Sequence, residues 1–151
     1  MLIFLQPSRL NKRGVIMNLE DWTIHFIRQR DMVSQGLVNY KAEKGRVLCE
    51  YKEGKKGVYY YGENLELDRI KKAEQEGDLT FVCLCNEYNF RVLVDNWGLF
   101  KQNNRLCFIF LNPGMAEKWI IKPSLHARIA DPKTLKKGLR TMYETCMGTP
   151  K

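Results

Sequence analysis

The first sustained pattern of apolar positions along the chain has the period of a helix. After Asn18, apolar residues recur every three or four positions, at Leu19, Trp22, Phe26 and Val33. This spacing places them along one helical face. Asn18 is a favourable N-cap residue, and two acids follow it in the first turn. The pattern predicts a helix over about residues 19–34 that is ended by Gly36.

Three short segments of extended character follow this helix. They cover about residues 37–42, 46–52 and 57–61, and the turns between them are rich in glycine and charged residues. Connections this short join antiparallel strands, because a parallel crossover needs roughly a dozen residues or more. We therefore predict two consecutive antiparallel hairpins.

Strands and helices alternate in the middle of the chain. Two continuously apolar runs have the character of strands buried on both faces. Between them, Phe90, Leu93, Val94 and Trp97 recur at helical spacing. A strand, a helix and a second strand joined by short links form a parallel βαβ unit. The predicted elements are a helix over 65–76, between Asn64 and Gly77, a strand over 79–85, a helix over 86–102 and a strand over 105–111.

The last part of the chain predicts one more strand and one more helix. The strand covers residues 118–122 and is closed by Pro123, and a loop follows it. The final helix has signals at both ends, because Asp131 is a suitable cap, Pro132 suits the first helical position and Gly148 follows the end.

Together these elements predict an α/β fold in a single domain. We expect a mixed β-sheet, built from antiparallel hairpins plus a parallel βαβ unit, with helices on both faces. The predicted domain covers residues 17–151. Residues 1–16 show no periodicity and are expected to be a disordered or dispensable tail, with Met17 as a candidate initiator.

The charge of the chain is unevenly distributed. The formal net charge is +8. Residues 1–16 carry 3 basic residues and no acid, residues 17–117 carry 14 basic and 15 acidic residues, and residues 118–151 carry 8 basic and 2 acidic residues. A localised positive surface suggests an anionic partner such as a nucleic acid, a phosphorylated ligand or a membrane surface. The alternative is a solubilising surface or the charge-rich composition typical of thermophiles.

The cysteines favour a reducing compartment. The chain has 5 of them, at positions 49, 83, 85, 107 and 146, and several lie inside apolar runs. Such thiols are expected to be buried as small hydrophobes rather than to bind zinc, since no CxxC knuckle is present. The longest apolar run, Leu106–Leu111, is too short for a membrane helix. The N-terminus places its apolar residues before its basic ones, the reverse of a secretory signal, so we expect a cytoplasmic protein without a membrane partner.

The predicted final helix separates basic from apolar residues. Lys133, Lys136, Lys137 and Arg140 follow helical spacing on one side, and Leu135, Leu139, Met142 and Cys146 follow it on the other. Because the apolar side must pack on the domain, the basic side is expected to face outward and contact phosphates. A solvated helix face is the alternative. The candidate nucleic-acid-binding residues are Lys118, Lys122, His126, Arg128, Lys133, Lys136, Lys137 and Arg140.

A second candidate site is the sequence Glu50-Tyr51-Lys52. Glu-x-Lys places a carboxylate and an ammonium group on one side of a strand. Metal-dependent phosphodiesterases use such a pair to hold a divalent ion and to orient the attacking water. The pattern is similar to the catalytic signature of PD-(D/E)XK nucleases, whose core runs helix, three strands, helix, strand, as predicted for residues 19–85. The resemblance implies a nuclease with Glu50 and Lys52 as catalytic residues and Mg²⁺ as cofactor.

The chain also departs from that family. The family carries Glu-x-Lys on the third strand, just before the second helix, and here that strand is Val58–Tyr61 without such a pair. The family also needs an acid on the preceding strand, and only Asn39 and Glu43 lie nearby. A cross-strand charge pair on an exposed face is therefore the alternative interpretation of Glu50 and Lys52.

Three functions remain open at this point. The first is nucleic-acid binding through the basic C-terminal helix, the second is a divergent metal-dependent nuclease, and the third is a protein-interaction module that forms a homodimer. Tyr59–Tyr61 could stack on bases, although strand pairing explains them as well. The chain has no P-loop, GxSxG, HExxH or kinase signature and no glycine-rich loop after the strand over 79–85. These absences disfavour standard ATPases, hydrolases and dehydrogenases.

Overall fold

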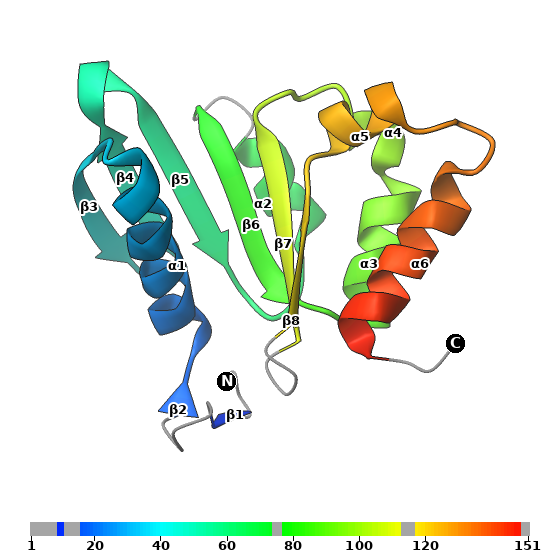
Figure 1. Cartoon of the computed structure of the whole chain (residues 1–151), viewed down its shortest axis with the longest axis horizontal. Coiled ribbons are helices and arrows are strands. Elements are labelled where there is room, and N and C mark those ends of the chain that lie inside the picture. Colours follow the sequence, from blue (N-terminus) through cyan, green and yellow to red (C-terminus); the bar gives the residue numbers. More distant parts are fainter. Residues whose placement is uncertain (1–8, 11–15, 74–76, 113–116, 149–151) are drawn as a thin grey trace.

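A mixed six-stranded sheet forms the centre of the computed structural model, which describes residues 9–10, 16–73, 77–112 and 117–148 (Figure 1). The strands lie in chain order across the sheet. β4 is antiparallel to both of its neighbours, β3 and β5. The next three strands, β5, β6 and β7, run parallel to one another, and β8 is antiparallel to β7. The predicted hairpins and the parallel βαβ unit are thereby confirmed. The strands are β3 (Leu37–Glu43), β4 (Arg46–Tyr51), β5 (Lys56–Tyr61), β6 (Asp78–Leu84), β7 (Leu106–Asn112) and β8 (Glu117–Ile121).

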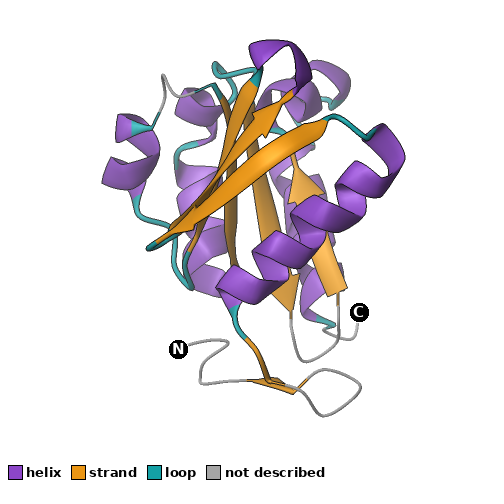
Figure 2. Cartoon of the chain, turned by 90° about the vertical axis from the view of Figure 1, so that its left-hand side faces the viewer, coloured by secondary structure: helices purple, strands orange, loops and turns teal. Residues whose placement is uncertain are grey.

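Helices lie on both faces of this sheet, as predicted (Figure 2). One face packs against α1 (Leu19–Ser34). The other face carries α2 (Leu67–Lys72), α3 (Glu87–Asp95), α4 (Trp97–Phe100), α5 (Pro123–Ile129) and α6 (Leu135–Met147). None of the helices in the described part of the chain has the length and apolar character needed to span a membrane.

The two faces have separate hydrophobic cores. Along β6, Leu79, Phe81 and Cys83 point into the core under α3 and α6, whereas Val82 points into the core under α1. Central strands buried on both sides explain the continuously apolar runs in the sequence. All five cysteines are buried and free, and no group of three metal-ligating side chains occurs among the described residues.

The beginning of the chain is described only in part. β1 (Arg9–Leu10) pairs antiparallel with β2 (Ile16–Met17). The remainder of the predicted tail, residues 1–8 and 11–15, lies outside the described residues.

Several predicted boundaries need correction at strand and helix ends. The side chain of Asn18 caps α1 as predicted, accepting from the backbone N–H of Asp21 at 2.7 Å, but the left-handed residue after the helix is Gln35 and not Gly36. β4 ends at Tyr51, because Lys52 begins the 3₁₀ turn η1 (Lys52–Gly54). The backbone N–H of Lys52 still donates to the carbonyl of Gly36 at 2.8 Å and extends the β3–β4 pairing by one residue, and the chain turns away at Glu53, whose backbone is left-handed (φ 67°).

The predicted helices around the βαβ unit are shorter than their apolar patterns suggested. α2 begins at Leu67, because Leu65 is buried and its backbone N–H donates to the Asn89 side chain at 2.7 Å. The helix predicted over 86–102 is divided at Asn96 into α3 and α4. At that residue the side-chain amide donates to the carbonyl of Val92 at 2.9 Å, in competition with the helical backbone pattern.

The last two helices also differ from the prediction. Residues 123–129, expected in a loop, form α5 with Pro123 in its first turn. α6 begins only at Leu135, because Asp131 accepts from the backbone N–H of Lys133 at 2.9 Å and forms a separate turn before the helix. Gly148 ends α6 in the left-handed conformation, as predicted.

Alkaline pH is expected to destabilise the fold. Tyr61 donates to Glu20 at 2.7 Å, and burial together with this bond raises the pKa of Tyr61 to about 12. Burial and the nearby Glu87 raise the pKa of Tyr143 to about 12 as well. An unfolded tyrosine titrates at about pH 10, so between about pH 10 and about pH 12 the folded chain retains protons that the unfolded chain loses.

The free energy of unfolding should fall across this interval, as measured by urea denaturation at a series of pH values. Tyr61→Phe should make the fall shallower, and an unchanged pH dependence would contradict the account.

Candidate functional site

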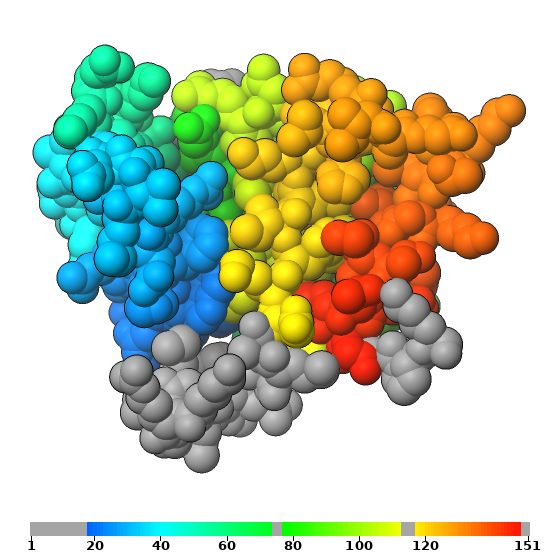
Figure 3. Space-filling view, viewed as in Figure 1, coloured from blue at the N-terminus to red at the C-terminus, as the bar shows by residue number. Residues whose placement is uncertain are grey.

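One face of the sheet is only partly covered by helices. α1 packs across β4, β5 and β6, and in Figure 1 no helix stands before β6 and β7 between α1 and β8. Two adjoining pockets that share Arg30 occupy this region, and the molecular surface is hollowed between α1 and β8 (Figure 3). We call this feature the α1–β8 groove.

The outer pocket of the groove lies between α1 and β8 and has a volume of about 560 Å³. On the α1 side, the half-buried rings of Trp22 and Phe26 are stacked with centroids 5.2 Å apart. Lys118 and Ile120 line it on the β8 side. Arg30 and Lys118 contribute positive charge, and none of the described residues that line this pocket is acidic.

The inner pocket lies at the amino ends of β5, β6 and β7 and has a volume of about 470 Å³. Five cations and three acids line it. Two of the acids are already engaged, because Asp31 accepts from the backbone N–H of Leu37 at 2.7 Å and Asp78 pairs with Arg105 at 3.2 Å. The excess of positive charge makes the pocket suitable for an anion. Its cations are Arg30, Lys52, Lys55, Arg105 and Lys122.

Arg30 is held at the junction of the two pockets. Its guanidinium lies 5.9 Å from the centroid of the Phe26 ring and donates to the Tyr59 hydroxyl at 3.5 Å. It makes no ion pair with any acid in the described part of the chain, so its charge is available to a ligand.

Among the described residues that line the groove, Cys107 contributes the one thiol, and this thiol is not activated. Burial raises the pKa of Cys107, although Lys122 and Arg30 act in the opposite direction. The thiol therefore stays protonated near neutral pH, and a protonated thiol is a poor nucleophile. The groove therefore offers a ligand positive charge and an aromatic surface, and no activated thiol.

The structure divides the predicted basic residues between two sides of the molecule. Along β8, Trp119 and Ile121 point into the core under α6, so Lys118 and Lys122 point to the opposite face and line the groove. His126 and Arg128 lie on α5, Lys133 lies in the turn before α6, and Lys136 and Lys137 are exposed on α6. Lys118 and Lys122 therefore do not extend the basic surface of α6.

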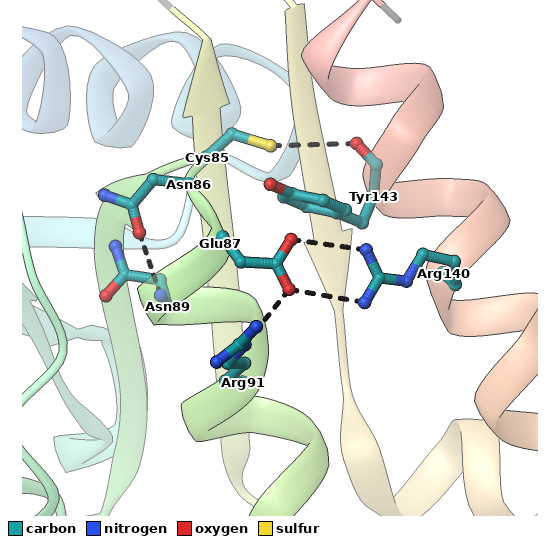
Figure 4. A network of polar contacts seen from close by, with 7 residues as sticks. All are labelled: Cys85, Asn86, Glu87, Asn89, Arg91, Arg140 and Tyr143. Carbon is teal, nitrogen blue, oxygen red and sulfur yellow. Dashed lines mark hydrogen bonds and ion pairs between the residues drawn. The ribbon is translucent and has the colours of Figure 1, made fainter.

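Arg140 is exposed on α6 like Lys136 and Lys137, but its guanidinium is engaged by an acid on another helix. Its two terminal nitrogens each donate to a carboxylate oxygen of Glu87 on α3 at 3.2 Å (Figure 4). The guanidinium also lies 4.7 Å from the ring centroid of Phe90 and 5.7 Å from that of Tyr143. Arg140 lowers the pKa of Glu87, with a smaller contribution from Arg91. This residue joins α3 to α6.

Arg140→Ala is expected to lower the free energy of unfolding by about 1–2 kcal/mol, from the loss of an exposed bidentate ion pair and a cation–π contact. The matched control is Lys136→Ala on the same helix, where we expect a change within about 0.5 kcal/mol. Urea denaturation of both variants measures the difference. Equal stability of the two variants would show that the α3–α6 contact contributes nothing.

The Glu-x-Lys residues do not come together as the prediction required. Glu50 is exposed on β4, on the face of Leu48 and away from α1, whereas Lys52 lies in η1 and lines the inner pocket. The third strand of the core, β5, carries no Glu-x-Lys pair, although the resemblance places the pair on that strand. The expected side-by-side placement of Glu50 and Lys52 is therefore wrong.

The tyrosines of β5 serve the fold. Tyr60 stacks on Phe81 with centroids 5.0 Å apart, Tyr59 is buried, and the Tyr61 hydroxyl joins α1 to the first hairpin turn through Glu20 and the backbone of Gly45. These contacts favour a role of Tyr59–Tyr61 in packing and strand pairing over a role in stacking on bases.

The sequence patterns did not identify the α1 side of the groove. Trp22 and Phe26 were assigned to the apolar stripe of the helix, but the fully buried residues of α1 are Leu19, Thr23 and Ile27. Trp22, Phe26 and Arg30 follow one another at intervals of four residues, and this spacing is the signal in the sequence. Comparison with known proteins found no matching family model, no matching curated protein and no matching solved structure.

Proposed function

We propose that the protein binds nucleic acid, and that a single strand lies in the α1–β8 groove. The observation that supports this most directly is the line of cations along the groove, formed by Arg30, Lys118 and Lys122 beside the Trp22–Phe26 stack. None of these three cations is paired with an acid in the described part of the chain. Unpaired cations along a groove attract the phosphate backbone and release its counterions on binding.

Several features favour a strand over a small ligand or a duplex. The two pockets adjoin, so together they suit an extended ligand. Non-specific single-strand binding combines a positive groove with aromatic side chains on which bases stack, and the half-buried Trp22 and Phe26 supply such a surface. The proposal keeps nucleic acid as the partner expected from the sequence and places Lys118 and Lys122, rather than α6, at the centre of the interface.

The first test uses the wild-type protein and fluorescently labelled oligonucleotides. Single-stranded DNA and RNA of about 20 nucleotides are compared with a duplex of the same sequence by fluorescence anisotropy. We expect the single strands to bind more tightly than the duplex at about 50 mM salt and to lose at least about tenfold in affinity at about 200 mM salt. Absence of binding to every oligonucleotide at low salt would overturn the proposal. Cleavage in the presence of Mg²⁺ that disappears in Glu50→Ala would instead favour the nuclease.

A further inference from the structure

We propose that the inner pocket binds the terminal phosphomonoester of the strand that lies in the groove. The protein would then bind phosphorylated strand ends in preference to internal segments. This inference rests on the proposed nucleic-acid binding and adds the class of strand that is preferred.

The position of the inner pocket suits the end of a strand. A strand in the outer pocket passes Arg30, which lines both pockets, and then reaches the turn η1 and the residues Asn104 and Arg105. The turn is fixed to the rest of the chain, because the Tyr51 N–H donates to the carbonyl of Lys55 at 2.7 Å and the Lys52 N–H donates to that of Gly36 at 2.8 Å. This wall of the pocket is therefore built into the fold.

The charge of the inner pocket exceeds what an internal phosphodiester requires. A phosphodiester carries a single negative charge, whereas a terminal phosphomonoester carries about −1.5 to −2 near pH 7. Lys52, Lys55 and Lys122 have no acidic partner among the described residues, and they join Arg30 at this end of the groove. Of the lining acids, only Glu53 lacks a partner in the described part of the chain.

The pocket also offers neutral hydrogen-bonding groups for the additional phosphate oxygens. Tyr59 and Thr80, which both carry hydroxyls, are among its lining residues. Burial raises the pKa of Tyr59, so its hydroxyl keeps its proton near neutral pH and remains a potential donor. Charge-assisted hydrogen bonds to phosphate oxygens are among the stronger polar contacts in proteins.

The test compares three oligonucleotides of one sequence, with a 5′-phosphate, with a 3′-phosphate, or with hydroxyls at both ends. We expect the wild-type protein to bind one of the phosphorylated forms at least about tenfold more tightly than the hydroxyl form. Lys52→Ala combined with Lys55→Ala should abolish this preference and leave the affinity for the hydroxyl form nearly unchanged. Both lysines are exposed, and circular dichroism confirms that the variant is folded.

Further measurements separate the failure of this inference from the failure of the proposed function. Lys118→Ala in the outer pocket should lower the affinity for all three oligonucleotides by a similar factor. Equal binding of the three forms by the wild-type protein overturns the end-binding inference and leaves nucleic-acid binding standing, whereas no binding of any form overturns both. A nucleoside monophosphate that competes as well as the phosphorylated oligonucleotide would show that the strand is not the ligand, which also overturns the inference.

Discussion

Trp97→Ala is expected to lower the free energy of unfolding by about 3–5 kcal/mol, the usual cost of truncating a buried aromatic side chain. Trp97 is only 8% exposed and begins α4, in the core that also contains Phe100 and Phe108. The ring centroids of Phe100 and Phe108 lie 5.0 Å apart, and Trp97 belongs to the same buried cluster, so its truncation leaves a cavity in this core. Urea denaturation followed by circular dichroism measures the loss.

The matched control is Tyr88→Ala on the neighbouring helix α3. Tyr88 is 56% exposed, so its truncation should cost less than about 1 kcal/mol. A cost below about 1 kcal/mol for Trp97→Ala as well would contradict the packing of α4 against the sheet.

Reversing two charges in the groove is expected to have the largest effect on binding. The double variant Lys118→Glu and Lys122→Glu removes two phosphate contacts and places two carboxylates beside the bound strand. We expect the affinity for single-stranded oligonucleotides to fall by about 100-fold or more at low salt, which corresponds to roughly 3 kcal/mol. Both side chains are exposed, and Lys118 on β8 and Lys122 directly after it alternate with the core residues Trp119 and Ile121, so the fold should be retained.

The control variant changes the net charge by the same amount on another surface. Lys136→Glu with Lys137→Glu alters two exposed lysines of α6, and we expect the affinity to change by less than about threefold, from long-range electrostatics alone. If this variant weakens binding more than the groove variant does, the C-terminal helix is the interface and the groove is not.

The parts of the fold that could be predicted were those with strong local signals. Short turns require antiparallel hairpins, a helix between two strands favours a parallel pair, and continuous apolar runs indicate burial on both sides, so the pairing of β3–β5 and of β6 with β7 followed from the pattern. The start of α1 at Asn18 could be predicted for the same reason, because the cap is a contact between Asn18 and Asp21 within the first turn.

The errors occurred where tertiary contacts override local preference. An apolar pattern that continues through Asn96 cannot show that this side chain bonds to the Val92 carbonyl and divides the helix. Arg140 has the spacing of a solvated stripe, and only the packing of α6 beside α3 reveals its partner Glu87. Pro123 both follows the end of β8 and begins α5. This proline was interpreted from the sequence only as the end of the strand, and the helix was therefore missed.

The candidate site was harder to predict because it joins distant segments. Lys118 and Lys122 were recognised as basic residues, but the face of β8 on which they lie depends on which alternate residues α6 covers. Arg30 is far from them in sequence and reaches the groove through the placement of α1 on the sheet. Charge and residue type alone could suggest nucleic acid as the partner, but they could not indicate which surface of the protein would bind it.

The most direct test of binding in the groove is the slope of log affinity against log salt concentration for a single-stranded oligonucleotide. Contacts from Arg30, Lys118 and Lys122 predict a slope of about −2 for the wild-type protein with an oligonucleotide that has hydroxyls at both ends. Lys118→Ala with Lys122→Ala should make the slope shallower by about 1.4, and Lys136→Ala with Lys137→Ala should leave it unchanged. A slope near zero, or one that becomes shallower only in the α6 variant, would contradict the account.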